Sequence, residues 1–215
     1  MSMLLDLLQP PAAAHGTRSY GVVTGVVTNN QDPEKLGRVR VRFPWLSHEE
    51  ESPWARVAMP MAGKDRGLWL LPEVDDEVLV AFEQGDARFP YVVGALWSRN
   101  APPPETNGDG KNALRVLRSR SGHVVRLDDT DGEEKIEIVD AARKCSIVIG
   151  TSQNTITLSC EGDLTLESKS GKLVLKANGV EFASRDDVKV EAQGELELKA
   201  SGGNVTVKGA AINLN

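Results

Sequence analysis

Aromatic residues are scarce in this chain and unevenly placed. They make up 5% of its 215 residues, and only Phe182 lies after Trp97. The first hundred residues can therefore build a conventional globular core around large side chains, whereas the rest of the chain must be built differently. This contrast predicts two domains. The aromatic residues expected in the first core are Tyr20, Phe43, Trp45, Trp54, Trp69, Phe82, Phe89, Tyr91 and Trp97.

Cysteine and histidine are also few, which removes several kinds of chemistry. Cys145 and Cys160 do not imply a disulfide framework, and they share the parity of buried strand positions, so we expect small core thiols. His15, His48 and His123 have no metal-ligand spacing. The sequence contains no recognisable nucleophile elbow, phosphate-binding loop or pair of catalytic carboxylates. We therefore expect no enzyme activity, no cofactor and no bound metal.

The sequence has neither an excess of basic charge nor a long apolar run. Its formal net charge is −6, and the first hundred residues hold 10 Lys and Arg against 13 Asp and Glu. This balance disfavours nucleic acid as a partner. Residues 3–8 are apolar but are interrupted by Asp6, and they lack the basic start and the length of an export or membrane segment. We expect a short docking helix or a disordered tail over residues 1–19.

Strict alternation of apolar and polar residues is the strongest pattern present. From residue 147 to the C-terminus an apolar–polar–apolar triplet recurs nine times, at steps of seven to nine residues. Alternation predicts strands with one buried face, and the regular step predicts a repeat architecture. The apolar pairs are Ile147/Ile149, Ile156/Leu158, Leu164/Leu166, Leu173/Leu175, Val180/Phe182, Val188/Val190, Leu196/Leu198, Val205/Val207 and Ile212/Leu214.

Small residues follow most of these pairs at the next inward position, and glycine marks several of the turns. Each unit is therefore predicted to form one short strand that ends in small residues and a turn, so that residues 147–215 form a β-helix. One chain could wind three units per turn, or three chains could wind together. We favour the trimer, because it leaves no long strand edge exposed. The predicted trimer core consists of Ile156, Leu158, Leu164, Leu166, Leu173, Leu175, Val180, Phe182, Val188, Val190, Leu196, Leu198, Val205 and Val207.

The first domain, residues 20–99, is predicted to be a small barrel. Its strand-like segments are separated by turn signals such as Asn-Asn, Asp-Pro and Gly-Asp, and five strands in this order favour an OB-type barrel. One alternative is a surface for single-stranded nucleic acid on Arg38, Arg40 and Arg42, but nearby acidic runs offset these charges. The predicted strands cover residues 21–28, 37–43, 54–59, 77–82 and 91–97.

A linker and a short β region join the two domains. Residues 100–112 contain three consecutive prolines followed by a Gly-Asp-Gly sequence, which is typical of a linker. Residues 113–146 contain two strand-like runs, 114–127 and 136–139, around a turn rich in Asp and Gly. We expect these runs to form a collar that leads from the barrel into the repeat.

Three stretches of the chain resemble a known family. They are GVVTNNQDPEKLGRVRVRFPW at residues 25–45, LPEVDDEVLVAFEQGDARFPYVVG at 71–94 and SGHVVRLDDT at 121–130. Together with the repeat, they resemble the spike proteins of contractile injection systems: bacteriophage baseplate assembly protein V and the C-terminal part of VgrG. The resemblance implies an all-β protein with an N-terminal OB-fold barrel followed by a C-terminal triple-stranded, trimeric β-helix needle.

The departures from this family suggest two partners. VgrG carries a large hub domain before its OB fold, whereas about twenty residues precede the barrel here, so the resemblance implies a separate baseplate hub protein. No histidine follows His123, so the metal-bound tip of other spikes is not expected, and a PAAR-repeat tip protein is implied instead. The expected hub-docking residues are Met3, Leu4, Leu5, Leu7 and Leu8, and the expected tip-binding residues are Ile212, Asn213, Leu214 and Asn215.

The function implied by the resemblance is that of a structural central spike that punctures a target envelope when a sheath contracts. Such a particle, whether a phage tail, a pyocin-like particle or an extracellular injection system, is assembled in the bacterial cytoplasm. It is extracellular on release, and its contact with the target membrane is transient. The alternatives are a trimeric β-helical tailspike that binds surface glycans and an OB-fold nucleic-acid-binding protein. The first would need exposed aromatic platforms on the needle, where Phe182 is expected to point inward.

Overall fold

The computed structural model describes residues 18–46 and 49–213. Regular structure in these residues is β, apart from one short 3-10 helix, η1 (Glu83–Gly85). The chain divides into two units, Met1–Gly162 and Asp163–Asn215. The all-β class expected from the alternating sequence is therefore confirmed.

Five strands of the first unit form one sheet in the order β2-β1-β6-β7-β3. All neighbours are antiparallel except β3 and β7. Two isolated bridges, Val39↔Ala55 and Arg42↔Glu51, also pair the segment before β3 with the β2 side, so the sheet curls into a partly closed barrel of the OB type. The strands are β1 (Val22–Asn29), β2 (Arg40–Arg42), β3 (Arg56–Val57), β6 (Glu77–Phe82) and β7 (Pro90–Ala95), and a separate hairpin joins β4 (Ala62–Gly63) to β5 (Arg66–Gly67).

Valine dominates the interior of this barrel. Strand alternation directs one set of side chains inward, and β-branched residues suit such pleated positions. Gly25 allows β1 and β2 to approach closely, because a Cβ atom at this position would lie 2.3 Å from Cγ1 of Val41. The buried core consists of Val27, Val39, Val41, Phe43, Ala55, Val78, Val80, Phe82 and Val92.

The prediction that the aromatic residues form the core is wrong for most of them. Only Phe43 and Phe82 are buried, and their ring centroids lie 5.5 Å apart. Trp69 and Trp97 are each 72% exposed, and Tyr20 is also exposed. The interior of a small barrel is filled by valine side chains, so the larger rings lie on loops and strand ends, where they add exposed apolar surface.

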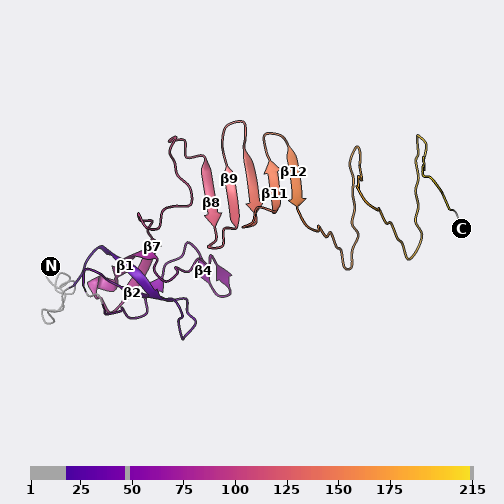
Figure 1. Cartoon of the computed structure of the whole chain (residues 1–215). Coiled ribbons are helices and arrows are strands. Elements are labelled where there is room, and N and C mark those ends of the chain that lie inside the picture. The colour runs from indigo at the N-terminus through magenta and orange to yellow at the C-terminus, as the bar shows by residue number, and fades with distance from the viewer. Residues whose placement is uncertain (1–17, 47–48, 214–215) are drawn as a thin grey trace, which may run out of the picture. The chain divides into compact units, whose positions relative to one another are not determined.

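A second sheet follows the linker and contains five antiparallel strands in chain order. The strands lie side by side in Figure 1. A turn at residues 119–123, with Gly122 at φ 101°, divides the run predicted as one strand over 114–127 into two. The strands are β8 (Leu114–Arg118), β9 (Val124–Asp128), β10 (Lys135–Val139), β11 (Cys145–Gly150) and β12 (Thr155–Cys160).

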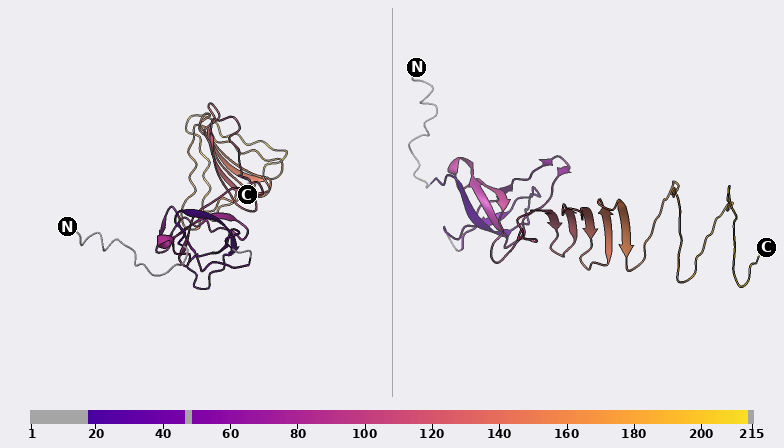
Figure 2. Two further views of the ribbon diagram at one scale, coloured as in Figure 1. Left: turned by 90° about the vertical axis from the view of Figure 1, so that its left-hand side faces the viewer. Right: turned by 90° about the horizontal axis from the view of Figure 1, so that it is seen from above.

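The division between sheet and repeat lies later than the sequence pattern places it. The first two repeat pairs, expected at the start of the needle, belong to β11 and β12 and pair with each other within the chain. Residues 163–213 contain no strand paired within the chain. In the right-hand view of Figure 2 the trace of this segment passes back and forth without strand arrows.

Candidate functional site

One face of the β8–β12 sheet is a continuous apolar surface. The register aligns Leu127, Ile136, Ile149 and Ile156 in one row across four strands. A second row contains Leu117, Val125, Ile138, Ile147 and Leu158. Every member of both rows is exposed, by 38% to 73%. A contiguous apolar face of this size is typical of a surface that another chain covers. We call this surface the apolar face.

The opposite face of the same sheet mixes paired charged residues with aliphatic ones, and the linker contacts it. Arg126 on β9 forms ion pairs with Glu137 on β10, at 3.4 Å, and with Glu105 of the linker, at 2.5 Å. Lys135 reaches Glu137 at 3.1 Å. These charges neutralise one another inside the chain, so this face already has its partners and the apolar face is the one that remains open.

The sequence-predicted trimer core is not brought together within one chain. The exposed fraction of its members ranges from 48% for Leu158 to 78% for Phe182. Only Ile156 and Leu158 lie in a strand of the described chain. Exposed apolar residues that alternate along unpaired backbone need both hydrogen-bond partners and apolar partners from outside the chain.

Sequence reasoning missed the collar part of the apolar face. Leu117, Val125, Leu127, Ile136 and Ile138 lie in the same two rows as the first repeat pairs, but the predicted trimer core did not include them. The signal was present, because Val125/Leu127 and Ile136/Ile138 are also apolar–polar–apolar triplets. The apolar–polar–apolar alternation therefore begins before residue 147, although without the regular spacing of the later units.

The structure corrects the prediction of free thiols, because Cys145 and Cys160 form a disulfide. The two residues lie directly opposite each other in the β11–β12 register, with their Cα atoms 4.1 Å apart. Glu161 N–H donates to the Lys144 carbonyl in the next rung, so the cysteine rung is of the non-hydrogen-bonded type, in which side chains lie closest. Spacing in the sequence could not reveal this pairing, because the register depends on the turn between the strands.

Arg38 and Arg40, at and just before the start of β2, do not form an open cationic surface. Arg38 pairs with Asp32 at 2.7 Å, and Arg40 pairs with Glu51 at 3.0 Å. Both guanidinium groups also lie over the Trp54 ring, with Arg40 5.0 Å from its centroid. A phosphate backbone would have to displace these carboxylates, which does not favour nucleic-acid binding.

The predicted tip-binding and hub-docking residues lie only partly within the described residues. Ile212 is 52% exposed, and Asn213 is exposed as well. Leu214 and Asn215, and the predicted hub-docking residues Met3, Leu4, Leu5, Leu7 and Leu8, lie outside the described residues. Within residues 18–46 and 49–213 no group of three or more His, Cys, Asp or Glu side chains could hold a metal ion. The same residues contain no helix of the length and apolarity needed to cross a membrane.

Comparison with known proteins shows what the barrel is similar to. Residues 23–97 match the type VI secretion system/phage-baseplate injector OB domain. The type VI secretion system spike proteins VgrG4b and VgrG1a of Pseudomonas aeruginosa are 33% and 30% identical to this chain over 60% and 61% of its length. VgrG3 of Vibrio cholerae is 33% identical over 48% of the chain.

The matches cover much less of the relatives than of this chain. They span 18%, 22% and 11% of VgrG4b, VgrG1a and VgrG3. The barrel strands β6 and β7, and all of β1 except its first residue Val22, lie within the matched residues 23–97. Residues 23–97 are therefore similar to an injector OB domain, and the resemblance of this chain to the spike proteins of type VI secretion systems and phage baseplates is confirmed.

Proposed function

We propose that this protein is the central spike of a contractile injection system baseplate, in which three copies wind together into a rigid β-helical needle. One observation carries the proposal: after an injector OB domain, residues 163–213 expose a regular series of apolar pairs and form no strand pairing within the chain. Backbone N–H and C=O groups of alternating strands are nearly always paired in folded proteins. Strands from other copies would lie between the successive passes of this segment and supply those partners.

Three copies suit the apolar face better than two or one. Two flat faces packed together would cover their side chains but leave the edge strand β12 open, since its outer edge has no strand partner in the described chain. Three faces arranged around an axis enclose a core of triangular section, and each β12 edge can then meet a strand of the next copy. The same arrangement continues into the repeat, with each copy adding one strand per level.

A needle of this kind acts through stiffness and needs no reactive group. Each chain is hydrogen-bonded to both others, so bending or unwinding the needle must break many backbone bonds together. Force applied along the axis by a contracting sheath is then transmitted to the target envelope. We propose that the protein has no enzyme activity of its own, and that its contact with the target membrane is transient.

We propose two further partners from the resemblance. A separate baseplate hub would hold the barrel end of the spike, with residues 3–8 as an apolar anchor. A PAAR-repeat protein would continue the β-helix beyond Ile212, by pairing with its strands and covering its last apolar layer. Assembly in the bacterial cytoplasm, followed by release within a phage tail or a related particle, completes the proposal.

The oligomeric state tests the proposal. Native mass measurement and sedimentation of the full 23.2 kDa chain at micromolar concentration should give a trimer. Ile147→Asp should abolish the trimer, because three unpaired carboxylates would meet in a low-dielectric core. Ser146→Asp is the matched control, since it lies on the opposite face of the same strand, and it should assemble like the parent. A folded monomer from the parent chain would refute the spike.

A further inference from the structure

The Cys145–Cys160 disulfide occupies the last complete rung before the chain leaves its own sheet. β12 ends at Cys160, and the boundary between the two units follows Gly162. Cys145 lies two residues before Ile147, and Cys160 lies two residues after Leu158. Both sulfur atoms are therefore on the apolar face, in line with its two rows.

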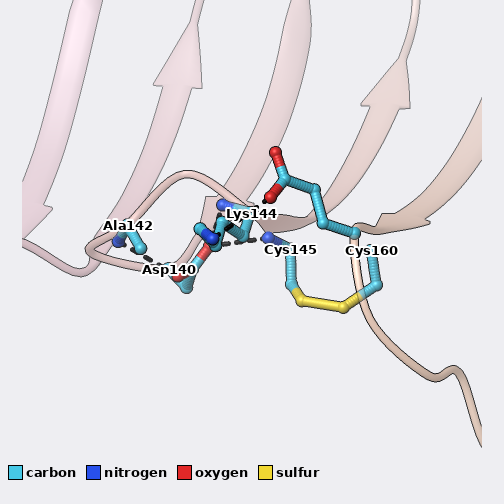
Figure 3. The surroundings of a disulfide bond; sticks show 6 residues. Asp140, Ala142, Lys144, Cys145 and Cys160 are labelled. Carbon is cyan, nitrogen blue, oxygen red and sulfur yellow. Dashed lines mark hydrogen bonds and ion pairs between the residues drawn. A yellow bond between two sulfur atoms is a disulfide. The ribbon is translucent and has the colours of Figure 1, made fainter.

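Four further contacts hold the ends of this rung in place. The Asp140 carboxylate accepts hydrogen bonds from the backbone N–H groups of Ala142 at 3.0 Å, and of Lys144 and Cys145 at 2.7 Å each, as Figure 3 shows. Beyond the rung, Lys144 Nζ lies 3.3 Å from the Glu161 carboxylate. The turn before Cys145 is thus organised by Asp140, and the strand ends beyond both cysteines are joined by an ion pair.

We propose that this disulfide is a register clasp for assembly. It holds β12, the edge strand, in one register against β11 before the partner chains arrive, so that all three copies present the same edge to the interwound segment. Because a slip of one residue would exchange the two faces of β12, an edge strand without this restraint can pair wrongly with a neighbour. The clasp rests on the proposed trimer for its role, but its formation within one chain does not depend on the trimer.

The chemistry of the clasp is a two-electron oxidation. The two thiols lose two protons and two electrons and form one S–S bond, while oxidised glutathione accepts them and becomes two thiols. In the reducing cytoplasm, where the spike is proposed to assemble, the bond forms when its reduction potential lies below that of the glutathione pool. Closing the loop between Cys145 and Cys160 lowers the conformational entropy of the unassembled chain. Correct β11–β12 pairing is then favoured before any contact between chains is made.

Mass measurement of one peptide tests whether the bond forms within a chain. Trypsin leaves both cysteines in the single peptide 145–169, because no Lys or Arg lies between Cys145 and Lys169. The full chain is refolded from denaturant in a glutathione redox buffer, and any remaining thiols are alkylated. The expected product is one unalkylated peptide, lighter than the dithiol by two hydrogens. Two peptides joined between chains, or a doubly alkylated peptide, would overturn the proposal.

The kinetics of trimer assembly test the proposed role of the disulfide. Trimer formation after dilution from denaturant, followed by light scattering, should be about tenfold slower for the chain kept reduced with dithiothreitol and for Cys145→Ser/Cys160→Ser than for the oxidised parent. The control Ser146→Ala/Ser159→Ala alters the neighbouring rung on the other face and should assemble at the parent rate. Equal rates for the oxidised and reduced chains would refute the clasp and leave the spike standing. A parent chain that never forms trimers would refute the spike, and the peptide mass would still report the bond.

Discussion

At the scale of single residues, Asp32 organises the loop between β1 and β2. Its side chain is only 2% exposed and accepts the backbone N–H groups of Glu34 at 3.1 Å, Leu36 at 2.9 Å and Arg38 at 3.3 Å. The guanidinium of Arg38 completes the arrangement with two further hydrogen bonds. Arg38, assisted by these N–H groups, holds the pKa of the Asp32 carboxyl well below its usual range.

The depressed pKa of Asp32 predicts a stability that falls in acid. Below the ordinary carboxyl pKa of about 4, the unfolded chain binds more protons than the folded chain, so this contribution is complete above that pH and is lost as the pH falls toward the folded pKa. Circular dichroism of the full chain from pH 7 to 2 should show the barrel transition moving to lower temperature below about pH 4.

Substitution of Asp32 distinguishes the stability contributed by this loop from the other effects of low pH on the chain. Asp32→Asn should lower the barrel transition at pH 7 by roughly 5 °C and make its dependence on pH shallower. Glu34→Gln is the matched control, because the Glu34 side chain is 66% exposed and makes only one ion pair with Arg38. An Asp32→Asn chain with the acid slope of the parent would contradict the assignment.

At the scale of elements, alternation decides which side chains face a partner. In the sheet, Ile147 and Ile149 lie on the apolar face, while Ser146 and Val148 point to the other side. The same parity, continued into the repeat, places Val190 inward and Glu191 outward. Lys189 and Glu191 approach each other closely on that outward side. The register of β11 and β12 fixes the faces of the first two units, and the parity of the later units stays a prediction.

The repeat predicts opposite outcomes for neighbouring substitutions. Val190→Asp should prevent assembly, since it would bury unpaired carboxylates in the needle core, whereas Glu191→Ala should be nearly silent because an exposed ion pair contributes little. Native mass measurement of the two variants gives the comparison. Equal tolerance at both positions would mean that the strand faces are exchanged.

At the scale of the whole molecule, stability is expected to belong to the assembled spike, because the apolar pairs of residues 163–213 have no partners within one chain. Three parts of the chain then differ in the contacts that stabilise them. The barrel has its own buried core, the β8–β12 sheet has one exposed apolar face, and the proposed needle would take its partners from other copies.

The proposed contact at residues 212–215 predicts how a tip protein binds. Ile212→Asp and Leu214→Asp should each weaken capture of a PAAR-repeat protein by the purified spike at least about tenfold, because a charge would enter an apolar layer. Binding by the parent should depend only weakly on salt, since residues 212–215 carry no charged side chain. Titration calorimetry at two salt concentrations measures both. Deletion of residues 1–19 serves as the control at the other end, because it should weaken hub binding and leave tip binding unchanged.

Local sequence determined much of the outcome by itself. Phe43 and Phe82, two of the aromatic residues expected in the core, are buried there, and turn-forming residues placed most of the strand boundaries within a few positions. The injector motifs at residues 25–45 and 71–94 predicted the family that comparison supports. These features depend on the period of a strand and on backbone preferences, which a single segment expresses without its neighbours.

Contacts between distant segments were decided only by tertiary structure. Two strands can pair in many registers that look alike in sequence, so the opposition of Cys145 and Cys160 follows only from the β11–β12 hairpin. The exposure of Trp69 and Trp97 likewise depends on the small interior of the barrel, because hydrophobic character alone does not say whether a side chain finds room inside. The sequence determined which residues alternate; the fold decided what each of them faces.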